Sequence, residues 1–311
     1  MVFRCLASRF IFRAIDPVFF PQGTPGNAFR GAFGHIFRRI ACVPTCQGVK
    51  GCDIRDRCAY ARIFEPACLD GPSGLADAPR PFVIRAGGLN GRQYEPGDLF
   101  SIDVHLFDLH EPVLKYFVLA FSQFAETGLG PGRGRVSLNA VCELNADRTP
   151  GRSLFDLTKS GAVGKSLPLE LELEPPAQPV SAIRVCFRTP TELRSSGAAA
   201  PVENFVALFS RIRDRVSTLR ALYGDGPLDI DFRGMAERAR AVRTVRSQVQ
   251  MESVRRRSSR TAQEHPLSGI TGEVDYEGDL TEFVPFLEAA YWTGVGKHTV
   301  WGNGALESSR P

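Results

Sequence analysis

The feature that most constrains the fold is an internal repeat with an offset of 166 residues. Thr-Gly-Leu-Gly at residues 127–130 corresponds to Thr-Gly-Val-Gly at residues 293–296. An apolar, helix-like stretch precedes each copy, and more glycine with a basic residue follows it. Chance rarely repeats a whole helix–loop–strand context, so the chain is predicted to contain two copies of one α+β unit. The order of elements favours the βαββαβ arrangement of tandem ferredoxin-like (RRM-like) domains, each ending in helix, glycine-rich loop and strand.

Hydrophobic periodicity predicts the individual elements. In the first unit we expect strands at residues 3–12, 82–85, 99–107 and 136–144, and helices at 27–40 and 113–124. In the second we expect a strand at 183–187, helices at 202–223, 233–243 and 283–292, a hairpin of 249–260 with 269–276, and a short strand at 299–301. The predicted domains are residues 1–145, with a cysteine-rich insert at 42–60, and residues 181–311. Residues 146–180, rich in Gly, Pro and charge, form the expected linker.

The charge distribution indicates an anionic partner. The net charge is only +4, but between residues 181 and 263 arginines outnumber acidic residues by about two to one. Arginine suits bidentate phosphate contacts and stacking on bases, which makes nucleic acid the first candidate. A hydrophobic fraction of 43% and a charged fraction of 23% are typical of a globular chain. No segment approaches the ~20 apolar residues that span a bilayer, so we expect no membrane partner and a cytoplasmic location.

The second copy of the repeat continues into a glycine-rich loop at residues 293–304, which also contains Lys297 and His298. Successive backbone amides in such a loop can form an anion site, and phosphate is the usual guest. Plain turn chemistry explains the glycines equally well. A nucleotide-binding P-loop is excluded, because that motif needs Ser or Thr directly after the lysine, where this chain has His298.

Four of the eight cysteines, Cys42, Cys46, Cys52 and Cys58, lie within seventeen residues. In a cytosolic protein such a cluster indicates a metal more than disulfides. The C-x₃-C-x₅-C-x₅-C spacing lacks the close C-x₂-C pairs of the strongest zinc motifs, so a structural zinc site and four free thiols both stay open. The cluster does not indicate an open catalytic site, and no cofactor is expected for catalysis.

Two ferredoxin-like units, a glycine-rich loop after the last helix and a basic hairpin resemble the RAMP superfamily of CRISPR RNA-binding proteins. Within it, the chain is most similar to the endoribonucleases that process CRISPR precursor RNA. The specific part of the resemblance is residues 269–278 together with the loop at 293–304. Phe-Arg-Gly-Ala-Phe-Gly-His at residues 29–35 resembles that family's first helix, and residues 42–60 resemble a cysteine-rich insert of one branch.

The resemblance implies metal-independent cleavage of CRISPR repeat RNA in precursor transcripts. The 2′-hydroxyl at the cut site attacks the neighbouring phosphate, giving a 2′,3′-cyclic phosphate and a 5′-hydroxyl. This chemistry needs a base, an acid and positive charge on the phosphate, and histidine suits either proton role. Relatives often carry the catalytic histidine in the first helix, which makes His35 the leading candidate, with Arg38 and Arg39 one turn on to hold the phosphate. Where some relatives have a tyrosine, this chain has Phe20, so Tyr60 is its proposed substitute.

The candidates for RNA contact are basic or glycine residues of the first helix, the two loops and the hairpin. They are Arg30; Gly128, Gly130, Arg133 and Arg135; Arg255, Arg256, Arg257 and Arg260; and Gly294, Gly296, Lys297, His298, Gly302 and Gly304. In the family the corresponding hairpin meets the RNA stem, and an A-form stem offers mainly shape and phosphate. The alternatives are a solvated charge run for the hairpin and ligand-free turns for the loops.

Two other functions are compatible with the same residues. One is a non-catalytic RAMP subunit that holds CRISPR RNA in an effector complex, with the other subunits as its partners. The other is a cysteine-cluster metalloprotein that acts in assembly. The expected function is the endoribonuclease, because the resemblance includes the helix that carries His35.

Overall fold

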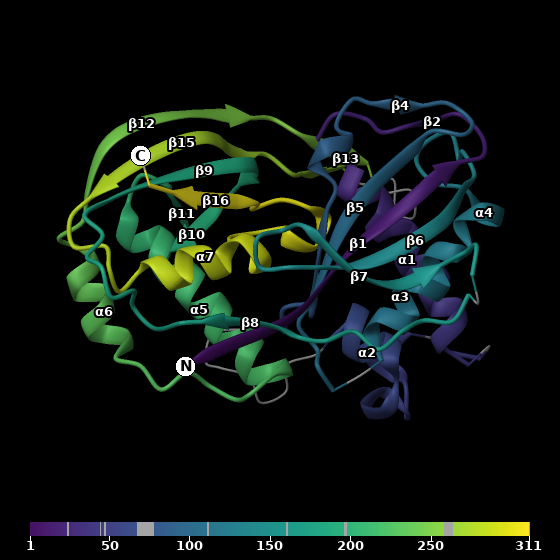
Figure 1. Cartoon of the computed structure of the whole chain (residues 1–311), viewed down its shortest axis with the longest axis horizontal. Helices are drawn as coiled ribbons and strands as arrows, with labels where there is room; N and C mark the ends of the chain where they lie inside the picture. The colour runs from purple at the N-terminus through teal and green to yellow at the C-terminus, as the bar shows by residue number, and fades with distance from the viewer. Residues whose placement is uncertain are drawn as a thin grey trace. The chain divides into compact units, whose positions relative to one another are not determined.

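The computed structural model describes residues 1–310 except 24, 44, 47, 67–77, 111, 160, 196–197 and 258–263. The chain divides into two compact units (Figure 1). The N-terminal unit comprises Arg4–Leu169 and Leu222–Gly224, and the C-terminal unit comprises Met1–Phe3, Glu170–Ala221 and Asp225–Pro311. Each unit has its own antiparallel sheet and its own apolar core.

An antiparallel sheet is the framework of the N-terminal unit. Its strands are β1 (Val2–Ala14), β3 (Phe82–Arg85), β5 (Leu99–Leu106), β6 (Val136–Leu144) and β7 (Pro150–Asp156). They lie in the order β3-β5-β1-β6-β7, and the short β8 (Leu169–Glu172) pairs with β1 as a sixth strand outside this order. Phe10 of β1 lies opposite Ile102 of β5 on one side and Val141 of β6 on the other. The first four strands therefore follow the ferredoxin-like order, and β7 adds a fifth strand from within residues 146–180.

Two helices, α1 (Pro25–Ala41) and α3 (Val113–Ser122), cover one face of this sheet, and α4 (Phe124–Thr127) follows α3. Alternate β1 residues such as Phe10 and Phe12 are fully buried, as the period-two pattern of a half-buried strand requires. The helices meet through the stacked rings of Phe33 and Phe117, whose centroids are 4.0 Å apart. The ring of Phe121 lies 5.1 Å from that of Phe10 and 5.8 Å from that of Phe12. Phenylalanine packing thus joins the helical layer to the sheet.

The sheet of the C-terminal unit repeats this topology. Its strands are β9 (Ala182–Thr191), β12 (Arg243–Glu252), β15 (Gly269–Glu277) and β16 (Leu306–Ser309). They lie in the order β12-β15-β9-β16. Val185 at the centre of β9 lies opposite Val274 of β15 and Ser308 of β16. In this order, β12, β15, β9 and β16 therefore correspond to β3, β5, β1 and β6 of the N-terminal unit.

Three helices belong to the C-terminal unit: α5 (Phe205–Tyr223), α6 (Phe232–Ala239) and α7 (Val284–Thr293). In Figure 1, α5 and α7 lie on the same side of the sheet. The core between them is again aromatic, with the rings of Phe209 and Phe283 4.6 Å apart and those of Phe205 and Tyr276 5.0 Å apart. The buried Tyr276 hydroxyl donates to the Val202 carbonyl at 2.6 Å, which satisfies a polar group inside this core.

Shorter elements complete the described chain. β2 (Val18–Phe19) pairs with β4 (Gln93–Tyr94), β10 (Leu193–Ser195) with β11 (Ala198–Ala200), and β13 (Arg255–Arg257) with β14 (Glu264–Pro266). The remaining elements are α2 (Ala59–Phe64), β8 (Leu169–Glu172), and the 3₁₀ turns η1 (Val49–Gly51), η2 (Arg55–Arg57), η3 (Gly87–Leu89) and η4 (Thr299–Trp301). The cysteine-rich insert therefore consists of η1, η2 and the beginning of α2.

The tandem ferredoxin-like fold predicted from the repeat is confirmed, since both sheets have the same strand order. The predicted strand at residues 299–301 is wrong, because these residues form the 3₁₀ turn η4. His298 before it has φ 62° and Gly302 after it has φ 95°, so the chain turns at both ends and cannot run on as a strand. The closing strand is β16, a few residues later.

The predicted helix at residues 233–243 is too long, and the first strand of the basic hairpin begins earlier than expected. α6 ends at Ala239, and β12 starts at Arg243 rather than at residue 249. Nearly every residue of β12 is exposed, so the strand lacks the alternation of apolar and polar residues that reveals a half-buried strand. Because this alternation is missing, the arginines at the beginning of β12 were assigned to the exposed face of a helix.

Candidate active site and nucleic-acid interface

The two glycine-rich loops have the same backbone geometry. Gly128 ends α4 with φ 72° and ψ 170°, and Gly294 ends α7 with φ 67° and ψ 176°. The buried aliphatic residue that follows donates its N–H back to the loop, Leu129 to the Gly134 carbonyl at 2.9 Å and Val295 to the Gly304 carbonyl at 3.0 Å. The repeat read from the sequence is therefore a repeat of structure.

Most of these glycines are required by the protein's own backbone. A Cβ on Gly296 would lie 2.3 Å from the Glu192 carbonyl oxygen, and one on Gly304 would lie 1.9 Å from that of Val295. A Cβ on Gly128 would lie 2.1 Å from the Arg133 carbonyl oxygen. Gly128, Gly294 and Gly304 are buried, whereas Gly130, Gly296 and Gly302 are half-buried. The glycines therefore shape the loops, and contact with a ligand falls mainly to the side chains that the loops carry.

Two cations of the loops are already paired with carboxylates. The Arg135 guanidinium makes a bidentate pair with Asp16, with Nε–Oδ2 and Nη2–Oδ1 distances of 2.7 and 2.9 Å. This pair lowers the pKa of Asp16 to about 2, chiefly through the side-chain hydrogen bond from Arg135. Lys297 Nζ lies 2.9 Å from Glu192 Oε1, and hydrogen bonds from Lys297 and Arg194 lower the pKa of Glu192 against the effect of its burial.

The two other charged or titratable side chains of the loops are placed differently. Arg133 is exposed and has φ 50°, the left-handed conformation that residues other than glycine seldom adopt. His298 has φ 62° and stacks on Trp301, with ring centroids 4.6 Å apart and an interplanar angle of 9°. The stack holds the imidazole against an aromatic surface at the end of the loop.

His35 lies on the exposed face of α1. Phe33 and Phe37 on either side of it are fully buried, so the helix turns His35 away from the core. Gly31, His35 and Arg39 are spaced four residues apart and are all exposed, which puts them on one stripe of the helix. His35 and Arg39 therefore present an imidazole and a guanidinium on the same face, one turn apart.

Arg38 and Arg30 are placed differently from Arg39. Arg38 Nη2 donates to the Cys46 carbonyl at 3.1 Å, so this side chain ties the end of α1 to the cysteine-rich insert. The Arg30 guanidinium carbon lies 4.4 Å from the ring centroid of Phe64 in α2, a cation–π contact at the edge of the core. Of the four candidates in α1, His35 and Arg39 are therefore exposed, whereas Arg30 and Arg38 contact other residues of the N-terminal unit.

Tyr60, the proposed substitute for the family's tyrosine, is buried in α2. Its hydroxyl donates to Glu65 Oε1 at 3.1 Å, and its ring stacks on Phe64 at 5.2 Å. Burial first, and the Glu65 carboxylate second, raise the pKa of this hydroxyl. Phe20 is also fully buried and stacks on Phe29, with centroids 5.6 Å apart. Neither ring shares the exposed stripe of α1.

The backbone of the basic hairpin is partly described. β13 and β14 place Arg255 opposite Pro266, Arg256 opposite His265 and Arg257 opposite Glu264. Arg260 lies outside the described residues. The hairpin prolongs the β12–β15 pair, since the Leu267 N–H donates to the Val254 carbonyl at 2.8 Å.

The sequence prediction missed two arginines of β12, Arg243 and Arg246. Both are exposed, and they pair across the sheet with Glu277 at 3.3 Å and with Asp275 at 3.8 Å. Their only sequence signal was the excess of arginine itself, because the strand has no apolar alternation. They extend the basic surface of the hairpin along the edge strand of the sheet.

The cluster cysteines, Cys42, Cys46, Cys52 and Cys58, carry free thiols. Within the described ranges, no group of three or more His, Cys, Asp or Glu side chains has the arrangement of a formed metal site. They lie on the turns between α1 and α2, with Cys42 directly after α1, Cys52 at the end of η1 and Cys58 at the N-cap of α2.

Two family models match the chain. Residues 3–165 match one described as an N-terminal domain. Residues 185–306 match one described as CRISPR-associated endoribonuclease Cas6. Residues 185–306 of the chain are therefore a Cas6-family domain. The chain is an endoribonuclease of CRISPR RNA processing.

Solved Cas6 structures share this fold along the whole chain. A Cas6 product complex is 14% identical with a TM-score of 0.56, covering 98% of this chain and 99% of its own. Cas6 of Thermus thermophilus is 14% identical with a TM-score of 0.53, and the match covers 98% of each chain. A chain of a partial Cas6-RT-Cas1–Cas2 complex is 10% identical with a TM-score of 0.57, covering 99% of this chain and 46% of that one. No curated protein matches the chain.

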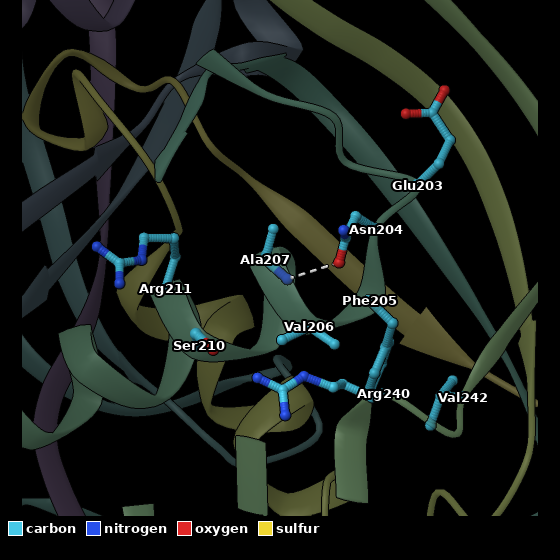
Figure 2. A pocket seen from close by; sticks show the side chains of 9 residues that line it. All are labelled: Glu203, Asn204, Phe205, Val206, Ala207, Ser210, Arg211, Arg240 and Val242. Atoms are coloured by element: carbon cyan, nitrogen blue, oxygen red, sulfur yellow. Dashed lines mark hydrogen bonds between the residues drawn. The ribbon is translucent and has the colours of Figure 1, made fainter. Parts of the chain in front are cut away.

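One pocket of the chain lies away from the predicted site residues, at the beginning of α5. It has a volume of about 570 Å³ and is lined by residues 203–207, 210, 211, 240 and 242. Figure 2 shows the Asn204 side chain accepting a hydrogen bond from the Ala207 N–H, at 3.1 Å. Its two arginines have nearby carboxylate partners, Arg211 with Asp214 at 2.9 Å and Arg240 with Glu237. The pocket is therefore not a site of concentrated positive charge.

A search of the described residues finds no helix that is both long and apolar enough to cross a membrane.

Proposed function

We propose that this chain binds CRISPR repeat RNA and cuts the precursor transcript without a catalytic metal ion. The 2′-oxygen at the cut site forms a bond to the adjacent phosphorus as the bond from phosphorus to the 5′-oxygen breaks. A base takes the proton of the 2′-hydroxyl and an acid gives one to the leaving 5′-oxygen. The products are a 2′,3′-cyclic phosphate and a 5′-hydroxyl.

The observation that carries the proposal is the exposed pair on α1. His35 is oriented away from the core, so its imidazole is accessible to a bound RNA strand. Imidazole transfers protons near neutral pH, which fits it to act as base or acid. Arg39, on the same stripe one turn later, can offset the charge that builds on the phosphate in the transition state.

The contacts of Arg38 and Tyr60 limit the roles that these two residues can have in cleavage. Arg38 is held by the Cys46 carbonyl, and we assign it a positioning role at the end of α1. Tyr60 could transfer a proton only if its hydroxyl left Glu65 and emerged from between Phe37 and Phe64. That requirement makes Tyr60 the weaker of the two proton-transfer candidates.

RNA binding is assigned to the hairpin of Arg255, Arg256, Arg257 and Arg260 and to the two glycine-rich loops. Arg133 is exposed, His298 stacks on Trp301 at the end of its loop, and Arg30 lies within α1. Arg135 and Lys297 would exchange a carboxylate partner for a phosphate. Arg243 and Arg246 of β12 extend the same basic surface and are added to the candidates.

The proposal also includes the domain division, the cellular location and the protein partners of the chain. We keep the division into a domain at residues 1–145, a connecting segment at 146–180 and a domain at 181–311. Because the substrate is a transcript, the chain would act in the cytoplasm. The likeness to a chain of a Cas6-RT-Cas1–Cas2 complex supports CRISPR proteins as further partners.

The test is cleavage of candidate repeat RNAs in EDTA, followed by analysis of the ends. We expect a 3′ fragment that polynucleotide kinase labels without prior phosphatase treatment, and a 5′ fragment that ends in a cyclic phosphate. A repeat with one 2′-deoxynucleotide at the cut site should bind with unchanged affinity and stay intact. Cleavage of that deoxy substrate, or cleavage that depends on added magnesium, would contradict the mechanism.

A further inference from the structure

The short helix α2 packs against α1 at Gly34, the residue directly before His35. The tip of the Phe64 ring, at the end of α2, points at the Gly34 backbone. A Cβ on Gly34 would lie 2.0 Å from Phe64 Cζ and 2.7 Å from each Cε atom, so no side chain larger than a hydrogen atom fits there. Gly34 therefore leaves a notch in the surface of α1, and the Phe64 ring fills it.

This notch explains a glycine that helix propensity disfavours. Glycine inside a helix is less stable than alanine, because it loses more backbone freedom on folding. α1 has a second such glycine, Gly31, which is exposed. Apart from its chain neighbours and the nearby helix backbone, a Cβ on Gly31 would meet no described atom within 4 Å. Of these two glycines, only Gly34 is required by a side chain packed against it.

The Phe64 ring cannot leave the notch without losing its other contacts. The Arg30 guanidinium carbon lies 4.4 Å from the ring centroid, and the rings of Phe33 and Phe82 lie 5.9 and 6.3 Å from it. The backbone of Phe64 is also held, since Arg80 Nε donates to its carbonyl at 2.6 Å. The ring therefore has one place in a close-packed core.

A buried ion pair fixes α2 itself. Arg62 of α2 makes a bidentate pair with Asp108, with an Nη2–Oδ1 distance of 3.1 Å, and the Asp108 side chain is fully buried. Separating the pair would leave a buried charge without its partner. Because Asp108 follows β5 closely in the chain, the pair anchors α2, and with it Phe64, to the sheet of the N-terminal unit.

The two residues before His35 are thus held by two different helices. Phe33 stacks on Phe117 of α3 at 4.0 Å, and Gly34 receives Phe64 of α2. The chain neighbours of Gly34, Phe33 and His35, both carry a Cβ. A shift of α1 by one residue in either direction would therefore place a Cβ where the ring tip lies. The contact fixes the axial position and the rotation of α1, and so the direction in which His35 points.

We propose that Gly34 and Phe64 are positioning residues for RNA cleavage, which together hold α1 so that the His35 imidazole meets the reacting oxygen. Both residues are buried and act through His35, so the inference rests on the function proposed for His35. Catalysis is sensitive to such placement, because a displacement of about 1 Å can lower a rate by about 10²-fold.

The test compares single-turnover cleavage at saturating repeat RNA, RNA affinity and thermal unfolding. Gly34→Ala should lower the saturating rate by about 10²-fold with little change in affinity. Phe64→Leu, which removes the ring tip, should lower the rate by less. The double variant Gly34→Ala/Phe64→Leu should cut faster than Gly34→Ala alone, because the shorter side chain makes room for the methyl group.

Two control variants separate positioning from general loss of stability. Phe155→Leu makes the same change at another buried phenylalanine of the N-terminal unit, in β7. It should lower the unfolding temperature and leave the saturating cleavage rate unchanged. Gly31→Ala should not lower the unfolding temperature, since its methyl group meets no packed side chain and alanine favours the helix.

The outcomes distinguish this inference from the proposed function. The inference is overturned if Gly34→Ala and Phe64→Leu both cut at the wild-type rate, or if the double variant is no faster than Gly34→Ala, while His35→Ala has lost cleavage. Should Gly34→Ala fail to fold, the saturating rate of Phe64→Leu decides, and a rate no lower than that of Phe155→Leu overturns the inference. A wild-type chain that does not cut, or a His35→Ala variant that cuts normally, overturns the proposed function and this inference with it.

Discussion

Arg184 of β9 and Asp275 of β15 face each other across the C-terminal sheet in a bidentate pair, with Nε–Oδ1 and Nη2–Oδ2 distances of 2.7 and 2.9 Å. Arg9 of β1 and Asp103 of β5 form the same pair in the N-terminal sheet, with the same two distances. In both units the pair joins the first strand of the repeat to its third strand, on the face away from the helices. The duplication therefore includes a charged contact as well as the backbone.

Replacing Asp275 with Asn should destabilise the C-terminal unit by about 2 kcal/mol, the usual worth of hydrogen bonds to a charged group. The hydrogen bond from Arg184 lowers the pKa of Asp275, so its contribution is present above the unfolded-state pKa and is lost as pH falls through the folded-state value. Urea unfolding should show a constant gap between wild type and Asp275→Asn near neutral pH that narrows below about pH 4. The control Asp56→Asn changes a carboxylate that is 91% exposed and should have no measurable effect.

His35→Ala should lower the cleavage rate by about 10²–10⁴-fold, the contribution of a positioned proton-transfer group. Affinity for repeat RNA should change little, because the side chain is proposed to act on the reacting oxygen. Single-turnover rates and filter binding separate the two quantities. His110→Ala replaces another exposed histidine and should cut normally; equal losses in both variants would count against His35.

Tyr60→Phe should leave the cleavage rate within about twofold of wild type and lower the stability by about 1 kcal/mol, from the lost hydrogen bond to Glu65. The ring contacts with Phe37 and Phe64 are kept in this variant. A cleavage rate that falls as far as in His35→Ala would instead make the Tyr60 hydroxyl a catalytic group.

Gly296→Ala should destabilise the C-terminal unit by more than about 1 kcal/mol, because φ is 77° and the new methyl group would lie 2.3 Å from the Glu192 carbonyl oxygen. Gly132→Ala in the other loop is the matched control. Its φ is not in the left-handed region, and apart from Gly132 and its two chain neighbours no atom of the described chain lies within 4 Å of the place its methyl group would take. Thermal unfolding of both variants compares the two sites. Equal stability of the two would mean that the second loop relaxes around the methyl group.

Alanine at Arg255, Arg256 and Arg257 should weaken binding to repeat RNA, and more so at low salt. Each phosphate contact that is lost should reduce the slope of log affinity against log salt by about 0.7–0.9. Titrations at several salt concentrations measure this slope. Arg92→Ala, an exposed arginine of the N-terminal unit, should leave both the affinity and the slope unchanged if binding is confined to the proposed surface.

The sequence predicted the features that depend on local chemistry. The Thr-Gly-aliphatic-Gly repeat located Gly128 and Gly294, because a left-handed turn after a helix demands glycine. The spacing of Phe29, Phe33 and Phe37 located the buried face of α1. These predictions needed only the period of a helix and the conformational range of one residue type.

Contacts that depend on how loops and turns pack could not be predicted from the sequence. The engagement of Tyr60 with Glu65, and of Lys297 with Glu192, follows from how turns are packed and has no signature in spacing. β12 was misplaced because a strand exposed along nearly all its length carries no apolar alternation.

The membership of Met1–Phe3 in the C-terminal unit has a practical consequence. The Leu173 N–H donates to the Met1 carbonyl at 2.8 Å, and Arg220 Nε donates to the Val2 carbonyl at 3.0 Å. The polypeptide crosses between the units four times along its length. No single proteolytic cut or truncation therefore yields two intact halves, and a fragment made of residues 181–311 alone would lack the strand end that its own unit uses.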